Sequence, residues 1–121
     1  MIYGIGTDIE KISTIGKLIE NTRFVQRFFH ESEIAEFEQR KMSAQSVTSA
    51  FCAKEAFFKS VGTGIDSSMK NVCLLHTQNG SPYIKLRGET AEKYVDYRFH
   101  VSISHAGDNA VATVICEEKK R

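Results

Sequence analysis

Three charged side chains in this sequence could together hold a metal ion beside a phosphate group. Glu55 and Lys59 lie in FCAKEAFFKSVGTGI, which runs from Phe51 to Ile65 and should be helical up to its glycines. Asp8 follows the segment GIGT near the start of the chain. Two carboxylates with open water positions suit Mg²⁺, which completes its shell with water and phosphate oxygens. Lys59 precedes the glycines of VGTG by one turn, where a backbone can approach a ligand closely.

Each of these residues also has a simpler interpretation. Glu55 and Lys59 are spaced i, i+4, so on a helix they could form a surface ion pair worth about 0.2–0.5 kcal/mol. Asp8 could be a turn or helix-cap aspartate. Lys54 falls inside the apolar arc of the same helix, where a lysine either extends its ammonium past its neighbours or lines a polar cleft. Spacing alone leaves these alternatives open.

A second candidate group lies in SISHAGD, at the end of a β-like segment. Ser102, Ser104, His105 and Asp108 are residue types found in nucleophilic catalysis. There is no nucleophile elbow, however, and on a strand Ser102 and Ser104 point away from the face that carries His105. We therefore expect Ser104 and His105 to donate hydrogen bonds to an anionic ligand. A structural hydrogen bond is the common alternative for His105.

The first half of the chain reads as one strand followed by helices. The β-like start MIYGIGTDI contains two glycines, which inside a strand mark a bulge or a close backbone approach. A helix should begin at Ser13 or Thr14 and stop at Asn21, and Ser32 is placed to cap a later helix. The longest helix should run from about residue 44 to residue 60.

The second half is dominated by strands. Gly62 should end the long helix as its left-handed residue. KNVCLLHT and PYIKLRG read as strands joined by the turn QNGSP, and FHVSISH and NAVATVIC as a second hairpin around AGD. ETAEKYVDY between the two hairpins reads as a short helix. The sequence therefore predicts an α+β fold, an antiparallel sheet with helices packed on one face, in a single domain of residues 1–121.

Composition excludes several classes of function. The 121 residues suit one domain, and a formal net charge of +1 gives no overall attraction to nucleic acid or membrane. No aromatic and basic stacking platform for nucleic acid is visible. No signal peptide is visible at the start, so none is expected, and no apolar run approaches the ~20 residues of a membrane span. Cys52, Cys73 and Cys116 are too widely spaced for a metal knuckle, which favours buried, reduced thiols in the cytoplasm.

Three segments taken together resemble the holo-acyl-carrier-protein synthases, the bacterial group of 4′-phosphopantetheinyl transferases. The segments are GIGTDIE, FCAKEAFFKSVGTGI and HVSISHAGDNAVATVI. The resemblance extends to HESEIAEFEQ and NGSPYIKL, so it covers nearly the whole chain. The run KEA-x-x-K-x-x-GTG combined with G-x-D near the N-terminus is a specific pattern. It favours the metal interpretation of Asp8 and Glu55 over the simpler ones.

The resemblance implies transfer of phosphopantetheine from coenzyme A to a serine of apo acyl carrier protein. The reaction would release adenosine 3′,5′-bisphosphate, require Mg²⁺ and support fatty acid biosynthesis in the bacterial cytoplasm. Asp8 and Glu55 would bind Mg²⁺, and Lys59 would contact the phosphates and stabilise charge on the transferred group. We expect Glu55 to accept the proton of the attacking serine, directly or through a metal-bound water. Members of this length resemble trimers with the site at the subunit boundary. The coenzyme A site would be lined by Phe51, Lys59, Gly62, Pro82, Ser104 and His105.

Three positions depart from the pattern of the family. Ala50 stands where an arginine is usual, so one phosphate or carrier contact is either absent or supplied by Lys54. Lys11, with Glu10 beside it, replaces an acid, and Thr14 replaces a residue that is commonly basic. These departures concern the docking of the carrier rather than the metal pair.

One part of the chain is locally basic. Residues 11–27 hold Lys11, Lys17, Arg23 and Arg27 against Glu20 alone. A solvated helix face is the simple interpretation. With the resemblance, this basic helix would dock an acidic carrier protein through Lys17, Arg23 and Arg27, because opposite charges steer association.

Two other functions remain open at this point. A Mg²⁺-dependent hydrolase of nucleotide pyrophosphates would use the same two carboxylates with water as the nucleophile. A non-catalytic nucleotide-binding module would leave Glu55 and Lys59 as a simple ion pair.

Overall fold

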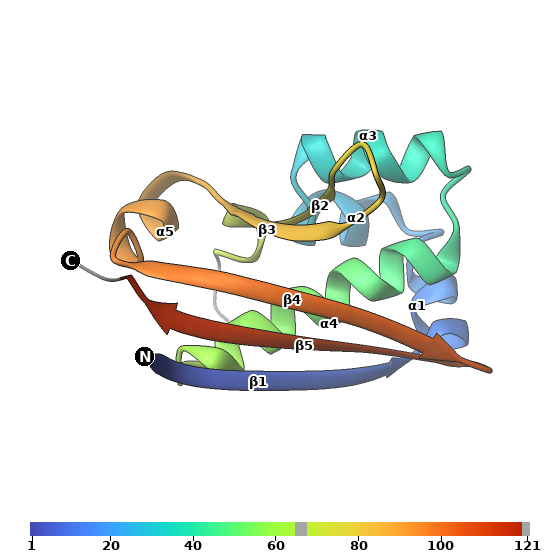
Figure 1. Cartoon of the computed structure of the whole chain (residues 1–121). Coiled ribbons are helices and arrows are strands. Elements are labelled where there is room, and N and C mark those ends of the chain that lie inside the picture. Colours follow the sequence, from blue (N-terminus) through green and yellow to red (C-terminus); the bar gives the residue numbers. More distant parts are fainter. Residues whose placement is uncertain (65–67, 120–121) are drawn as a thin grey trace.

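The computed structural model describes residues 1–64 and 68–119, so Ile65 at the end of the long motif lies outside the described residues. Figure 1 shows the elements in their layers. In chain order they are β1 (Ile2–Lys11), α1 (Ile12–Leu18), α2 (Thr22–Phe28), α3 (Glu31–Gln39), α4 (Ala44–Ser60), the 3₁₀ turn η1 (Met69–Asn71), β2 (Val72–His76), β3 (Pro82–Leu86), α5 (Gly88–Lys93), β4 (Tyr97–Ala106) and β5 (Asn109–Glu118).

The strands form two antiparallel sheets. The larger sheet has the order β1-β5-β4, and the β2–β3 hairpin forms the smaller one. In the larger sheet Asp8 pairs with Ala112, which in turn pairs with Ile103, so β1 and β4 are the two edges. The α+β fold with antiparallel strands is confirmed, and both expected hairpins form. The single sheet of the expectation is divided, because β3 of the first hairpin lies beside β4 (Figure 1) but forms no hydrogen-bonded ladder with it.

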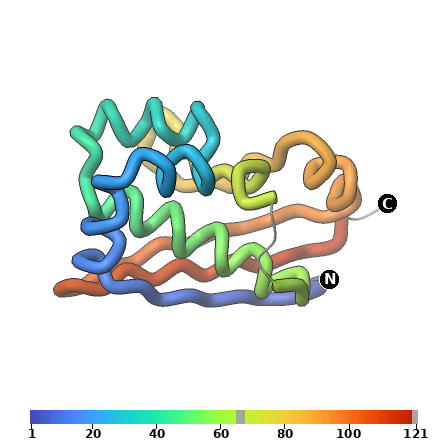
Figure 2. The backbone as a smooth tube through the Cα atoms, turned by 180° about the vertical axis from the view of Figure 1, so that it is seen from behind, coloured from blue at the N-terminus to red at the C-terminus, as the bar shows by residue number. Residues whose placement is uncertain are grey.

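The long helix α4 lies across the inner face of the larger sheet (Figures 1 and 2). Its bounds agree with the expectation from the sequence. The sheet buries small residues against it, including Ala110, Ala112 and Val114 of β5, while Phe57 and Ala53 of the helix are fully buried. The apolar arc of α4 and the inner face of β5 thus make the core that holds the functional residues in place.

The first two helices differ in detail from the expectation. α1 begins at Ile12, before the expected start, and ends at Leu18. Asn21 does not end α1 but begins α2, because its side-chain oxygen accepts a hydrogen bond from the backbone N–H of Arg23. Asparagine is a favourable residue at a helix start, so its place between two helices could be interpreted in either way.

The N-cap of α3 is His30, and the expectation of Ser32 was wrong. Nδ1 of His30 accepts a hydrogen bond from the backbone N–H of Ser32. Oε1 of Glu33 accepts one from the backbone N–H of His30 at 3.0 Å, which completes a capping box. Within residues 1–64 and 68–119, no helix has both the length and the apolar character of a membrane span.

Candidate active site

Strand β1 turns its acidic residues towards α4. Gly6, Asp8 and Glu10 alternate with exposed residues and share the inner face of the strand. A Cβ atom added to Gly6 would lie 2.0 Å from the carbonyl oxygen of Ala56, so only glycine permits this approach of strand and helix. The close backbone approach expected from the glycines is therefore confirmed. It places the two carboxylates of β1 directly beside the helix.

The C-terminal end of α4 is shaped by its glycine turn. Gly62 has a φ of +79° and follows the last turn of the helix, as expected. Its N–H donates to the carbonyl of Lys59, and the N–H of Thr63 donates to the carbonyl of Phe58, both at 3.1 Å. This pair of bonds is a Schellman motif, which needs a left-handed residue. The turn brings Thr63 and Gly64 to the cavity that Lys59 lines.

Asp8, Glu10 and Glu55 meet at the interface of β1 and α4. One carboxylate oxygen from each lies within 4.8 Å of the others. Nζ of Lys59 is 3.3 Å from Oδ1 of Asp8 and donates to the carbonyl of Thr7 at 2.9 Å. Asp8, Glu55 and Lys59 line a cavity of about 300 Å³ together with Phe58, Thr63 and Gly64. The expected meeting of Asp8, Glu55 and Lys59 is thus found in the fold.

The three carboxyl groups disturb one another. The pKa of Glu55 is raised to about 9, mainly by burial, and the neighbouring carboxyl groups of Glu10 and Asp8 act in the same direction. Burial also raises the pKa of Glu10, and the neighbouring Asp8 adds to this effect. Packed carboxyl groups in a site of low polarity resist ionisation together. A positive charge placed among them would relieve this repulsion.

The donor set fits a divalent cation that prefers oxygen ligands. Asp8 is only 8% exposed, and its Oδ2 is the one buried side-chain oxygen or nitrogen of the described residues that lacks a hydrogen-bond partner. A buried carboxylate oxygen without a partner is costly unless a ligand satisfies it. Asp8 and Glu55 therefore fit Mg²⁺, and Glu10 stands within reach of the same position.

Glu55 and Lys59 do not form the simple ion pair with each other. The ion pair that the structure gives to Lys59 is with Asp8 on the neighbouring strand. The helical spacing of Glu55 and Lys59 therefore serves to place both side chains at one cavity.

Both expectations for Lys54 were wrong, because its ammonium is completely buried. Nζ lies 2.6 Å from Oε1 of Glu33 and also donates to the carbonyls of Met69 and Val72. Burial lowers the pKa of Lys54 and raises that of Glu33, and the charge of each partner opposes these shifts. Because its ammonium is held in this way, Lys54 cannot supply the contact that an arginine makes in the family where this chain has Ala50.

Two expected coenzyme A residues line a second cavity. Pro82 and His105 border a space of about 230 Å³ together with Arg40, Gln45, Ser46, Ser49, His76, Gly80 and Ile103. Nε2 of His105 is 3.0 Å from Nε2 of Gln45. This cavity adjoins β4, at the edge of the sheet opposite to β1, and shares no lining residue with the cavity at Asp8. A single chain therefore does not bring the two groups together.

Ser104 and Phe51 lie apart from both of these cavities. Ser104 is exposed on β4, where alternation gives it the outer face, away from α4. Phe51, on α4, is partly buried and packs with Phe24 and Phe28, with ring centroids 6.0 Å apart in each case.

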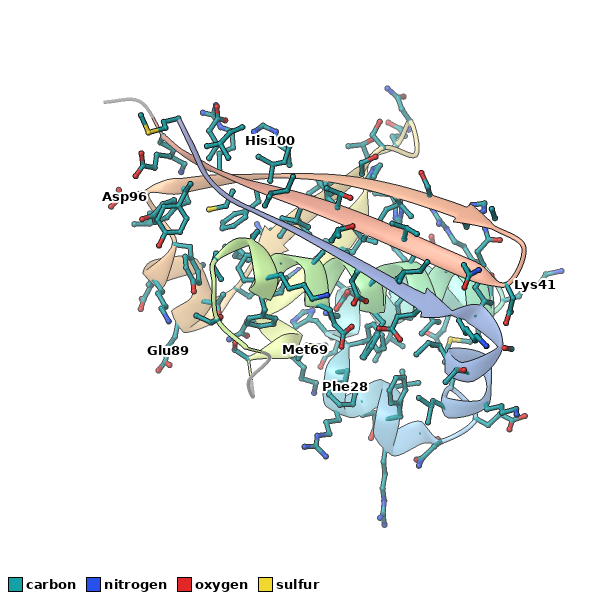
Figure 3. The ribbon with its side chains drawn as sticks, turned by 90° about the horizontal axis from the view of Figure 1, so that it is seen from below. Phe28, Lys41, Met69, Glu89, Asp96 and His100 are labelled. Carbon is teal, nitrogen blue, oxygen red and sulfur yellow. The ribbon has the colours of Figure 1, made fainter. Side chains whose placement is uncertain are left out.

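The basic segment is divided between two helices rather than one. Lys17 lies in the last turn of α1 and Arg27 in the last turn of α2, with Arg23 in the first turn of α2. All three are exposed, and the guanidinium of Arg27 lies 5.4 Å from the ring centre of Phe28. Figure 3 labels Phe28 on this side of the molecule. We call Lys17, Arg23 and Arg27 the basic surface.

Sequence reasoning missed Glu10 as a member of the acidic group. The signal was present, because Asp8 and Glu10 are separated by one residue and a strand turns such residues to the same face. No motif marks Glu10, which stands out in the sequence only as the neighbour of Lys11.

Comparison with known proteins identifies the family of this chain. The family model of the 4′-phosphopantetheinyl transferase superfamily matches residues 4–115. A holo-[acyl-carrier-protein] synthase from Clostridium novyi is 41% identical over 97% of this chain and 88% of its own length. A relative of the same name from Clostridium tetani is 40% identical over 97% of each chain.

Solved structures of the same family share the fold of this chain. The holo-[acyl-carrier-protein] synthase of Neisseria meningitidis has a TM-score of 0.86 and 33% identity, covering 98% of this chain and 100% of its own. That of Bacillus anthracis, solved in complex with CoA (3′,5′-ADP), has a TM-score of 0.84 and 31% identity, covering 98% and 99%. The chain therefore belongs to the 4′-phosphopantetheinyl transferase superfamily and, within it, to the holo-[acyl-carrier-protein] synthases.

Proposed function

We propose that this chain transfers 4′-phosphopantetheine from coenzyme A to a serine hydroxyl of apo acyl carrier protein, with Mg²⁺, and releases adenosine 3′,5′-bisphosphate. The observation that carries the proposal is the meeting of Asp8, Glu55 and Lys59 at one cavity. Phosphoryl transfer asks a protein mainly for positioning and for neutralisation of charge, and this group can supply both. The names of the relatives, and the complex of the Bacillus anthracis protein, support the choice of substrates.

Asp8 and Glu55 would hold the Mg²⁺, which when bound neutralises the diphosphate of coenzyme A and the charge that grows on the leaving group. Lys59 places its ammonium beside the same phosphates as a point charge. The serine oxygen forms a bond to the phosphorus on the pantetheine side, and the bond from that phosphorus to the bridging oxygen breaks. Glu55 accepts the proton of the serine, which balances the step.

Coenzyme A is expected to extend beyond one chain. Phe51 and Gly62 lie on or beside α4, whereas Pro82 of β3 and His105 of β4 line the second cavity and Ser104 is on the outer face of β4. A trimer with its site at the subunit boundary would set the second cavity of one copy against the first cavity of another. This assembly is supported by the exposed apolar residues Ile5 and Ile9 of β1, because exposed apolar patches commonly mark interfaces.

The carrier is expected to dock at the basic surface. Acidic carriers would be attracted to Lys17, Arg23 and Arg27, and this attraction would weaken as salt is added. The partly buried rings of Phe24 and Phe28 lie on the same helix as the two arginines and offer apolar contact area. The bacterial sources of the relatives support a bacterial source for this chain, and a cytoplasmic location stays a prediction.

The test is mass spectrometry of an apo acyl carrier protein incubated with coenzyme A. We expect the carrier to gain one phosphopantetheine in the presence of Mg²⁺ and none in the presence of a chelator. Asp8→Asn should abolish the gain, whereas Glu38→Gln on the exposed side of α3 should not change it. Release of free phosphopantetheine without carrier would instead favour the hydrolase. Coenzyme A binding that survives chelation, with no transfer, would favour the binding module.

A further inference from the structure

Glu10 contributes a third carboxylate that the expected metal pair does not include. One of its carboxylate oxygens lies within 4.8 Å of a carboxylate oxygen of Asp8 and of one of Glu55. Asp8 and Glu10 come from one strand and Glu55 from the helix packed on it. Since β1 pairs with β5 without interruption from Gly4 to Lys11, the two carboxylates on the strand are positioned by a rigid element.

The protein pairs one cation with this group of three carboxyl groups. Among the described residues, the ion pairs assign Lys59 to Asp8 and no cationic group to Glu10 or Glu55. When all three carboxyl groups are ionised, the one ammonium leaves two negative charges uncancelled. A single divalent cation would cancel them. A partly buried group of carboxylates with such an excess is unfavourable unless it takes up a proton or a cation.

An independent observation indicates where a ligand would sit. Oδ1 of Asp8 faces Lys59, but its Oδ2 is buried and has no partner among the described residues. Asp8 is 8% exposed, so solvent does not satisfy this atom. The other two members of the group are Glu10 and Glu55, which are acceptors themselves when ionised. A cation is therefore the ligand whose chemistry suits the unpartnered oxygen.

We propose that Glu10 is a third protein ligand of the divalent cation, beside Asp8 and Glu55, and that this chain binds the cation before coenzyme A arrives. A site with fewer carboxylates depends on the phosphates of the substrate to complete it, because affinity for hard cations rises with the number of charged ligands. Three protein oxygens still leave the remaining octahedral positions to phosphate and water. The order of binding rests on the proposed function, whereas the cation site does not.

The test measures binding of Mn²⁺, as a probe for Mg²⁺, by electron paramagnetic resonance of the free ion without coenzyme A. We expect one site in the wild type and an affinity at least about tenfold weaker in Glu10→Gln. Glu38→Gln is the matched control and should bind as the wild type does. Glu10→Asp keeps the charge on a shorter side chain and should fall between the wild type and Glu10→Gln.

A second measurement protects the test against misfolding. The melting temperature of each variant is determined in chelator and again with Mn²⁺, and the rise caused by the ion should be smaller in Glu10→Gln than in Glu38→Gln. Equal Mn²⁺ affinity in Glu10→Gln and the wild type would refute the role of Glu10, even if transfer to the carrier is observed. Weakened binding in Glu10→Gln would uphold it, even if the wild type transfers nothing to the carrier.

Discussion

Lys59 is held loosely at the candidate site. Its Nζ lies 3.3 Å from Oδ1 of Asp8, and 56% of its side chain is exposed. An ion pair with so exposed a member contributes about 0–1 kcal/mol, because water screens it. The ammonium can therefore turn from Asp8 to a bound phosphate at little cost, which suits a residue that acts on the substrate rather than on the fold.

Replacing Lys59 with methionine should therefore reduce transfer without unfolding the protein. We expect kcat to fall on the order of 100-fold, as for the loss of one group that stabilises charge in a transition state. The melting temperature should change little. Steady-state kinetics and thermal unfolding measure the two effects, with Lys70→Met, at an exposed lysine in η1, as the control. A large loss of stability with unchanged kcat would assign Lys59 a structural role.

The stability of the metal-free protein should decrease as the pH rises. The pKa of Glu55 is raised from 4.5 to about 9, first by burial. A carboxyl group whose pKa is higher in the folded chain binds a proton on folding. Its contribution is therefore complete below the unfolded pKa of 4.5 and is lost as the pH rises to about 9. Urea unfolding across this window, in chelator, measures the effect.

The matched variant for this measurement is Glu55→Gln. It cannot ionise, so its free energy of unfolding should depend less on pH than that of the wild type. Mg²⁺ should restore wild-type stability at the alkaline end, because a bound cation takes the place of the proton. Identical pH slopes for the two proteins would show that Glu55 does not titrate as expected.

Single residues differ in how far the sequence reveals their role. Asp8 and Glu55 could be paired because each lies in a specific motif. Strand alternation alone could place Glu10 on the same face as Asp8, but no motif marks it. Lys54 could not be placed from helix spacing, because its partner Glu33 comes from another helix and meets it only through tertiary packing. A helical wheel shows that Lys54 lies on the buried side of the helix, but it does not show which residue neutralises its charge.

At the scale of elements, the approach of β1 to α4 positions the carboxylates. Gly6→Ala should separate the two elements, since its Cβ would lie 2.0 Å from the carbonyl oxygen of Ala56. We expect a loss of at least about 1–3 kcal/mol in the free energy of unfolding, as in overpacked cores. Binding of Mn²⁺ should also weaken. Gly64→Ala, where nothing lies within 4 Å, is the stability control. Full stability in Gly6→Ala would contradict the close approach.

The buried pair of Lys54 and Glu33 joins α4, α3 and the start of β2. Lys54→Met alone should cost about 3–5 kcal/mol, because it leaves the carboxylate of Glu33 buried without its cation. Glu33→Gln with Lys54→Met should cost less than the sum of the single changes, because no charge then stays buried. Urea denaturation of the four proteins gives the coupling energy. Additive costs would show that the pair does not act as a unit.

The regular elements were more accessible to sequence reasoning than their connections. The bounds of α4 followed from its apolar arc and Gly62, and the hairpins followed from their turns. The cap of α3 was missed because histidine is an unusual N-cap, and its capping box uses Glu33, which also binds Lys54. The two sheets are separate because the first hairpin does not pair with β4. Local sequence patterns do not specify this pairing.

At the scale of the whole molecule, the two cavities lie at opposite edges of the larger sheet. Asp8 is on β1 and His105 on β4, with β5 between them and α4 across the inner face (Figures 1 and 2). The outer face of the sheet, towards the viewer in Figure 3, carries exposed residues such as Ile5, Ile9 and His100. Copies of the chain that associate through such faces could bring unlike edges together, because rotational symmetry repeats one contact around a ring.

This arrangement predicts that two inactive variants should restore activity when mixed. Asp8→Asn removes the carboxylate of Asp8 from the cavity beside β1. His105→Ala removes the imidazole from the cavity beside β4. If each site takes Asp8 from one copy and His105 from another, a mixed assembly contains some sites in which both residues are intact. Random mixing should produce them in roughly a quarter of the sites. The two variants are unfolded together, refolded, and assayed for transfer of phosphopantetheine to the carrier, with each variant refolded alone as the control. If both residues serve the same site within one chain, every chain carries one defect and the mixture should be no more active than its components.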